Sequence, residues 1–125
     1  MKNRQQPTNE AAEVYVLGCM ILCNPGSRAM DDVATARGML TPDDFNHPAH
    51  RIIFRHLVKM AYSFDIVNLE NLRRSLDKSG ELPVVGGVEY LVRIVESIPM
   101  VGHAREAAAM VRRANVERSI EVPEE

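Results

Sequence analysis

Apolar residues recur at helical spacing along most of the chain and are separated by short clusters of Pro, Gly, Asn and Asp. This pattern predicts six helices and one short helical turn that carries Phe45. We place the helices over residues 9–23, 28–37, 49–62, 68–79, 88–98 and from 102 or 103 to 119, and the turn at residues 41–44. No segment alternates apolar and polar residues for long enough to predict a strand, so the expected class is all-α.

The first predicted helix is apolar around nearly its whole circumference. A helix of this kind is normally buried by neighbours on several sides. We therefore expect a compact single-domain bundle of about six helices around a buried central helix. The predicted organisation is a polar lead-in at residues 1–8, a helical domain at residues 9–119 and an acidic tail at residues 120–125.

The later helices each show an apolar stripe that we expect to face the core. Gly38 is expected to end the second helix, and Pro99 the fifth. The expected inward residues are Met30, Val33 and Ala34 in the second helix; Ile53, Leu57, Met60 and Phe64 along the third; Leu69, Leu72 and Leu76 in the fourth; Val88, Leu91, Val92, Val95 and Ile98 in the fifth; and Ala104, Ala107, Ala108 and Val111 in the last.

Charge and composition narrow the class of protein. The 125 residues contain 15 Lys and Arg against 17 Asp and Glu, a formal net charge of −2, which disfavours a strongly basic nucleic-acid binder. Two cysteines cannot build a disulfide framework and indicate a reducing cytosol. The longest apolar run, Val14 to Cys23, is far shorter than the roughly 20 residues that span a bilayer. We expect a cytoplasmic protein without membrane contact.

The chain lacks the usual chemistry of a nucleotide or metal site. It contains no phosphate-binding loop of the G-x-x-x-x-G-K-[ST] type. Gly86 and Gly87 either bind an anion at a helix start or form a plain turn, and the turn is favoured. Cys19 and Cys23 lie on one helix face as metal ligands would, but buried cysteines more often act as small apolar residues. We expect no catalytic, cofactor-binding or metal-binding residues.

A cluster of acidic residues and histidines offers a second candidate site. Asp43, Asp44, His47 and His50 fall within eight residues and could form an acid–base pair or a metal site. Asp44 and His47 also stand where helix caps are needed. We favour capping and packing over chemistry for this cluster.

The last helix has a modest positive bias and supplies the candidate partner-binding residues. These are Arg105, Arg112 and Arg113, together with Glu117. A solvated helix face accounts for the same residues more simply than a phosphate track does.

Several short motifs occur in a distinctive order. They are Ala12-Glu13-x-x-Val16-Leu17-Gly18, Asp44-Phe45 followed by His50, Ile53 and Phe54, Asp65-Ile66-Val67-Asn68-Leu69, Gly80-x-Leu82, and Val85-Gly86-Gly87-x-x-Tyr90-Leu91. Over residues 7–115 this series resembles the N-terminal domain of DnaB-type replicative DNA helicases. The sequence departs from the family pattern at His103 and Ala107, where Asn and Tyr are usual, so the resemblance does not define the packing of the last helix.

The resemblance implies a helical collar domain that dimerises, joins a hexamer and helps to recruit primase and a helicase loader. DNA would be contacted only through the assembled helicase. The helical hairpin, the linker and the motor that uses ATP and Mg²⁺ to unwind duplex DNA are not found in these 125 residues. We therefore expect no enzymatic activity from this chain alone.

Two other interpretations stay open at this point. The chain could be a stand-alone protein with the collar fold that acts as an adaptor or inhibitor of helicase assembly. It could also be a small helical DNA-binding regulator, although its near-neutral charge disfavours this. The sequence does not reveal which face contacts a partner or how many copies assemble.

Overall fold

Six α-helices and one 3₁₀ turn form the part of the chain that the computed structural model describes, which is residues 9–23, 26–63, 65–99 and 101–120. No strand occurs within these residues, and the prediction of an all-α fold is confirmed. The elements are α1 (Glu10–Leu22), α2 (Ala29–Met39), η1 (Pro42–Asp44), α3 (Pro48–Tyr62), α4 (Leu69–Ser79), α5 (Gly87–Glu96) and α6 (Ala104–Ile120).

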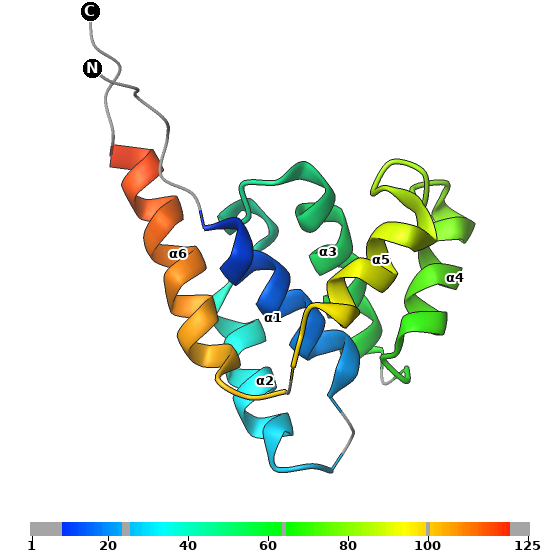
Figure 1. Ribbon diagram of the computed structural model, residues 1–125, viewed down its shortest axis with the longest axis horizontal. Coiled ribbons are helices and arrows are strands. Elements are labelled where there is room, and N and C mark those ends of the chain that lie inside the picture. Colours follow the sequence, from blue (N-terminus) through cyan, green and yellow to red (C-terminus); the bar gives the residue numbers. More distant parts are fainter. Residues whose placement is uncertain (1–8, 24–25, 64, 100, 121–125) are drawn as a thin grey trace, which may run out of the picture.

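Helix α1 occupies the centre of the bundle, as its apolar circumference predicts. It lies between α6 on one side and α3 and α5 on the other (Figure 1), and it contacts α2 and α4 as well. Val16, Leu17 and Cys19 are completely buried. The side chain of Asn9 accepts a hydrogen bond from the backbone N–H of Ala12 at 3.1 Å and so caps the helix start.

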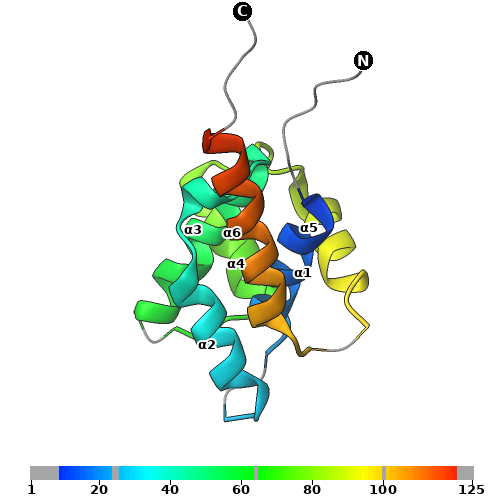
Figure 2. The ribbon, with the colours of Figure 1, turned by 90° about the vertical axis from the view of Figure 1, so that its left-hand side faces the viewer.

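Helix α6 packs closely along α1 and α2 because its inward face consists mainly of alanines. Figure 2 views the bundle from the α6 side, with α2 and α1 on either side of it. The expected small-residue stripe is confirmed, and Ala114 extends it. The buried residues of this stripe are Ala104, Ala107, Ala108, Val111 and Ala114.

Glycine allows a second close approach, between α1 and α5. A Cβ added at Gly18 would lie 2.8 Å from Ile98 Cδ1 and 3.5 Å from the Ile94 carbonyl oxygen. No side chain fits there unless Ile98 moves, which is why the central helix carries glycine at this position.

Two predicted inward stripes are partly wrong. In α2, Val33 and Ala36 are buried, whereas Met30 is 37% exposed at the edge of the bundle. In α5, Leu91 and Ile94 are buried, whereas Val88 is 40% exposed in the first turn. In both helices the fully buried residues are spaced by three, and the exposed residues Met30 and Val88 lie in the first turn. Ala34, Val92 and Val95, also expected to face inward, are half-buried.

The predicted boundaries hold to within a few residues. Helix α2 continues through Gly38 to Met39, so Gly38 does not end it. Gly80 ends α4 in the left-handed conformation, with a φ of 80°, as the Ser-Gly pair predicts. Phe64, the lead-in at residues 1–8 and residues 121–125 of the predicted tail lie outside the described residues. None of the described helices is both long and apolar enough to cross a membrane.

Candidate functional site

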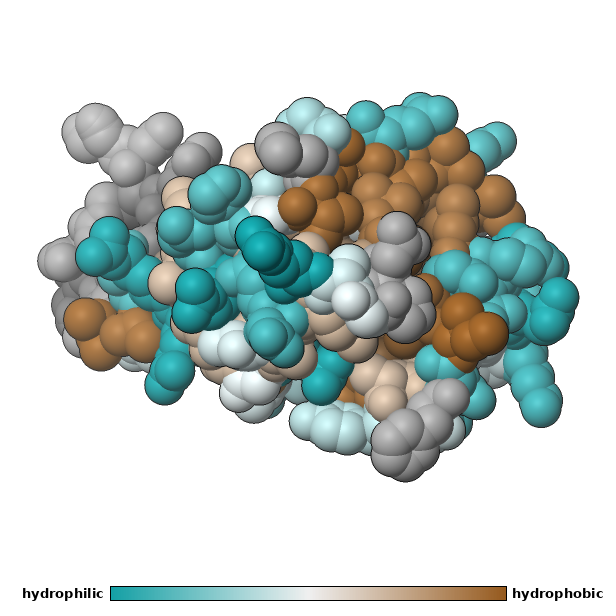
Figure 3. All heavy atoms as spheres, turned by 90° about the horizontal axis from the view of Figure 1, so that it is seen from below, coloured by the Kyte–Doolittle hydropathy of each residue, from teal (hydrophilic) through white to brown (hydrophobic). Residues whose placement is uncertain are grey.

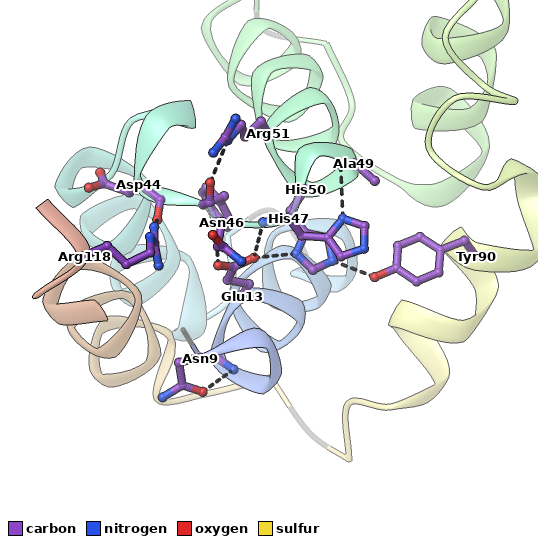
Figure 4. A network of polar contacts seen from close by, with 12 residues as sticks. Asn9, Glu13, Asp44, Asn46, His47, Ala49, His50, Arg51, Tyr90 and Arg118 are labelled. Atoms are coloured by element: carbon purple, nitrogen blue, oxygen red, sulfur yellow. Dashed lines mark hydrogen bonds and ion pairs between the residues drawn. The ribbon is translucent and has the colours of Figure 1, made fainter. Parts of the chain in front are cut away.

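A buried series of hydrogen bonds joins Glu13 on α1, His50 on α3 and Tyr90 on α5 (Figure 4). Glu13 Oε1 lies 2.7 Å from His50 Nδ1, and His50 Nε2 lies 2.6 Å from Tyr90 Oη. The side chains of Glu13 and His50 are 1% and 0% exposed. The three residues therefore fix the relative positions of three helices at the centre of the bundle.

Glu13 also holds the loop between η1 and α3. Its two carboxylate oxygens accept the backbone N–H groups of Asn46 at 2.7 Å and His47 at 3.4 Å. Burial raises the pKa of the Glu13 carboxyl, but the hydrogen bonds from His50 and from the Asn46 and His47 backbone outweigh it and hold the pKa below its usual value of 4.5. The carboxylate is therefore ionised at neutral pH and satisfied by several donors.

The direction of the first hydrogen bond follows from the carboxylate. An ionised carboxylate only accepts, so His50 Nδ1 donates to Glu13. Burial raises the pKa of the Tyr90 phenol, which keeps its proton at neutral pH and shares a hydrogen bond with His50 Nε2. Both ring nitrogens of His50 are thus occupied inside the protein. The ring offers no nitrogen to a metal ion or to a substrate.

The acidic residues and histidines of the second predicted site act as caps and packing groups. Asp44 Oδ2 accepts the backbone N–H of Thr41 at 2.8 Å in a capping box, and Asp44 Oδ1 accepts from Asn115 of α6 at 2.7 Å. His47 caps α3 by accepting the N–H of Ala49 at 3.2 Å. The capping interpretation of Asp44 and His47 is confirmed, and Asp43 is exposed.

A second polar network ties α3 to α4 and to the turn that follows α4. His56 Nδ1 lies 2.7 Å from Ser75 Oγ, and His56 Nε2 lies 2.7 Å from Glu81 Oε1. Arg55 and Ser79 also donate to Glu81, at 2.8 and 2.9 Å. The hydrogen bonds from His56 and Ser79 lower the pKa of the Glu81 carboxyl.

The order hydroxyl, imidazole and carboxylate is also that of an acyl-transfer relay. Such a relay requires backbone N–H groups that are free to stabilise an oxyanion. Ser75 lies in the interior of α4, where the neighbouring N–H groups are bonded within the helix. We therefore interpret this network as a structural tether.

Both cysteines are buried in the core. Cys19 Sγ faces the carbonyl oxygen of Gly102 at 3.9 Å, and burial raises the pKa of its thiol. Cys23 Sγ lies 3.7 Å from Ser27 Oγ and 3.8 Å from Met30 Sδ. Across the described ranges, no group of three or more His, Cys, Asp and Glu residues is arranged to hold a metal ion.

The candidate partner-binding residues on α6 differ in their surroundings. Arg112, Arg113 and Glu117 are exposed, away from the alanine stripe of the helix. Arg105 is also exposed, but its guanidinium Nε donates to Asp32 Oδ1 of α2 at 2.9 Å. A partner can therefore contact Arg112, Arg113 and Glu117 without breaking an ion pair among the described residues. To bind the Arg105 guanidinium, a partner has to break its ion pair with Asp32.

Asp32 is a structural residue that the sequence analysis missed. Its Oδ2 accepts the backbone N–H of Ala104 at 2.6 Å, and its Oδ1 lies 3.4 Å from the N–H of Arg105. A residue of α2 thus caps the start of α6, while His103 just before the helix has a φ of 58°. No local sequence signal marks a cap that comes from 72 residues earlier in the chain.

Three comparisons with known proteins agree with this architecture. The family model described as "DnaB-like helicase N terminal domain" matches residues 5–113. The replicative DNA helicase DnaB of Geobacillus stearothermophilus is 29% identical over 117 residues, which cover 94% of this chain and 24% of that protein. The replicative DNA helicase DnaC of Bacillus subtilis is 28% identical over 120 residues, which cover 96% of this chain and 25% of that protein.

The chain thus spans about a quarter of the length of these two relatives. A solved structure has the same fold: the crystal structure of the N-terminal domain of DnaB helicase from Mycobacterium tuberculosis matches with a TM-score of 0.82 and 28% identity, covering 91% of this chain and 78% of that one. Glu13, His50 and Tyr90 all lie within the residues that the family model matches. The chain belongs to the family of DnaB-like helicase N-terminal domains.

Proposed function

We propose that this chain is the N-terminal assembly domain of a replicative DNA helicase. In this role it associates with further copies to form the collar of a hexamer, and it presents a surface to primase and to a helicase loader. The observation that carries the proposal is the family match over residues 5–113, together with the fold shared with a solved DnaB N-terminal domain. ATP-driven unwinding would belong to other parts of the parent enzyme.

The internal chemistry supports a scaffold rather than a catalyst. The imidazoles of His50 and His56 each have both nitrogens hydrogen-bonded inside the protein, and Glu13 is nearly inaccessible to solvent. These networks join four of the helices into one body, which suits a domain that positions other macromolecules. The proposed role requires no metal or cofactor bound to this domain, and its place is the cytoplasm.

The exposed side of α6 is the proposed contact for primase or the loader. Arg112, Arg113 and Glu117 project from it without an ion-pair partner among the described residues, so a partner can engage them at no cost in broken contacts. The formal charge of −2 supports DNA contact only through the assembled helicase.

Sedimentation equilibrium of the chain tests the assembly role, and co-precipitation with purified primase and loader tests recognition. We expect reversible self-association and retention of at least one partner. The double variant Arg112→Glu/Arg113→Glu should lose the partner, whereas Arg28→Glu, an exposed arginine beside α2, should keep it. The proposal would be overturned if the chain stays monomeric at concentrations up to about 1 mM and also binds neither primase nor the loader. At that concentration only very weak association escapes detection. ATP hydrolysis by the chain alone would contradict the scaffold role.

A further inference from the structure

A surface hollow of about 580 Å³ lies between the end of α3, the loop after it and one side of α4. Three cationic side chains line it: Lys59 from α3, and Arg74 and Lys78 from α4. All three are exposed. We refer to this feature as the α3–α4 hollow.

The α3–α4 hollow is positively charged although the chain as a whole has a net charge of −2. Its only acidic lining residue among those described is Asp65. Lys59 and Lys78 form no ion pair within the described residues. Each lies in the last turn of its helix, where the helix dipole offsets only about half a unit charge.

Arg74 is only weakly paired with a carboxylate, so its guanidinium can also interact with a bound ligand. The carboxylate it faces, Glu70, lies 3.4 Å from Arg74 Nη2 but 2.7 Å from Arg73 Nη2. Arg73 lowers the pKa of Glu70 more than Arg74 does. One carboxylate is therefore shared by two arginines, and the closer contact belongs to the arginine outside the hollow.

The same hollow has an apolar component. Ile66 lines it with 63% of its side chain exposed, and the buried Met60 lies beside it. Seen from below, the half of the molecule that carries α4 and α5 shows broad hydrophobic areas bordered by hydrophilic side chains (Figure 3). An apolar side chain placed against Ile66 would remove hydrophobic surface from water within a ring of positive charge.

We propose that the α3–α4 hollow binds an acidic segment of a partner protein, in which an aliphatic side chain flanked by Asp or Glu packs on Ile66. The carboxylates then face Lys59, Arg74 and Lys78. The exposed Ile66 favours such a peptide over a nucleic-acid strand, because an aliphatic side chain removes apolar surface from water there and a phosphate does not. The inference goes beyond the proposed assembly role and does not depend on it, because both charge and shape belong to the single domain.

Fluorescence anisotropy with the whole 125-residue chain tests this inference. The probe is a labelled synthetic peptide of Glu residues with Leu at every third or fourth position. Two further probes are a peptide with Ser in place of Leu and a labelled oligothymidine. We expect the Glu/Leu peptide to bind in a salt-sensitive manner, the Glu/Ser peptide to bind several-fold more weakly, and oligothymidine not to bind at the same protein concentration.

Variants locate the binding. Lys59→Glu/Lys78→Glu should lower the affinity for the Glu/Leu peptide at least tenfold, and Ile66→Ser should lower it several-fold. The matched control is Arg28→Glu/Arg93→Glu, at two exposed arginines that do not line the hollow, which changes the net charge equally and should leave the affinity within twofold. Circular dichroism checks that each variant is folded, and chemical-shift changes in the unaltered chain provide a reading that no substitution can disturb.

The outcomes separate the alternatives. Absence of peptide binding, equal loss in both double variants, or shifts that cluster away from Lys59, Ile66 and Lys78 would overturn the inference. Oligothymidine that binds at these residues as tightly as the peptide would assign the hollow to nucleic acid instead. These results do not affect the self-association measured by sedimentation. A failure of this inference can therefore be distinguished from a failure of the assembly role.

Discussion

Glu13 accepts a 2.7 Å hydrogen bond from His50, which lies 37 residues further along the chain. Tyr90 extends the contact from the other ring nitrogen of His50. Each member comes from a different one of the sequence motifs by which the chain resembles its family. Three of the five motifs therefore have a shared physical role, because they supply the parts of one network that holds α1, α3 and α5 together.

Glu13→Gln should lower the free energy of unfolding by about 1–3 kcal/mol, the usual cost of leaving buried hydrogen-bonding groups unsatisfied. A neutral amide has one acceptor oxygen, whereas Glu13 accepts from His50, Asn46 and His47 with two. Urea unfolding followed by circular dichroism measures the loss. Tyr90→Phe removes only the last hydrogen bond and should cost about 1 kcal/mol. A larger loss for Tyr90→Phe than for Glu13→Gln would contradict the central place of the carboxylate.

The stability of the domain should depend on pH through Glu13. Its pKa in the folded protein lies below the usual 4.5, so the carboxylate contributes stability that is fully present above that value and is lost as the pH falls through the folded pKa. Glu13→Gln lacks this contribution. The difference in unfolding free energy between the original chain and Glu13→Gln should therefore shrink steadily below about pH 4.5. A difference that stays constant down to acid unfolding would show that the carboxylate gains nothing from its donors.

Helical periodicity was sufficient to predict the class, the number of helices and the central position of α1, because a helix that is apolar on all sides has to be surrounded. It misplaced Met30 and Val88, because periodicity gives the direction of an apolar stripe but not how much of it the rest of the fold covers. Local capping signals likewise predicted the roles of Asp44 and His47. Each of these inferences uses residues close together in the chain.

Contacts between distant residues could not be predicted in the same way. Asp32 caps a helix that begins 72 residues later, and nothing in the sequence around Asp32 distinguishes it from the exposed Asp31. The α3–α4 hollow combines Lys59 with Lys78 from two helices whose spacing depends on the packing of both. The partner-binding role of Arg105, Arg112, Arg113 and Glu117 stays a prediction.

Gly18→Ala should destabilise the protein by about 1–3 kcal/mol, because a methyl group at this position overlaps the Ile98 side chain, which has to shift within a packed contact. Gly38→Ala is the matched control. It lies in α2, a Cβ there meets nothing within 4 Å, and alanine should stabilise the helix by up to about 1 kcal/mol. Thermal melting measures both. The double variant Gly18→Ala/Ile98→Ala should recover part of the loss if the overlap is its cause.

Ile53→Ala should cost about 2–5 kcal/mol, the usual result of emptying a packed apolar position. Ile53 is completely buried in α3. Ile66→Ala makes the same chemical change at an exposed position and should alter the stability by no more than about 0.5 kcal/mol. Urea midpoints compare the two variants. Similar losses at both positions would place Ile66 in a packed core and would remove it from the surface of the α3–α4 hollow.

Asp32→Ala should destabilise the domain by about 0.5–2 kcal/mol, as the loss of a helix N-cap does elsewhere. The carboxylate of Asp32 accepts the N–H of Ala104 at 2.6 Å and also pairs with the Arg105 side chain at 2.9 Å. The cap should dominate, since the Arg105 side chain is 64% exposed and exposed ion pairs contribute about 0–1 kcal/mol.

Two further variants separate the cap from the ion pair. Asp32→Asn keeps an oxygen that can accept the Ala104 N–H and should cost less than Asp32→Ala. Arg105→Ala removes only the ion pair and should cost the least. Urea unfolding at low and high salt ranks the three, because salt weakens the ion pair but leaves the cap largely intact. If Arg105→Ala proves as costly as Asp32→Ala, then the ion pair is what fixes the start of α6, and Arg105 cannot exchange Asp32 for a partner protein without loosening that helix.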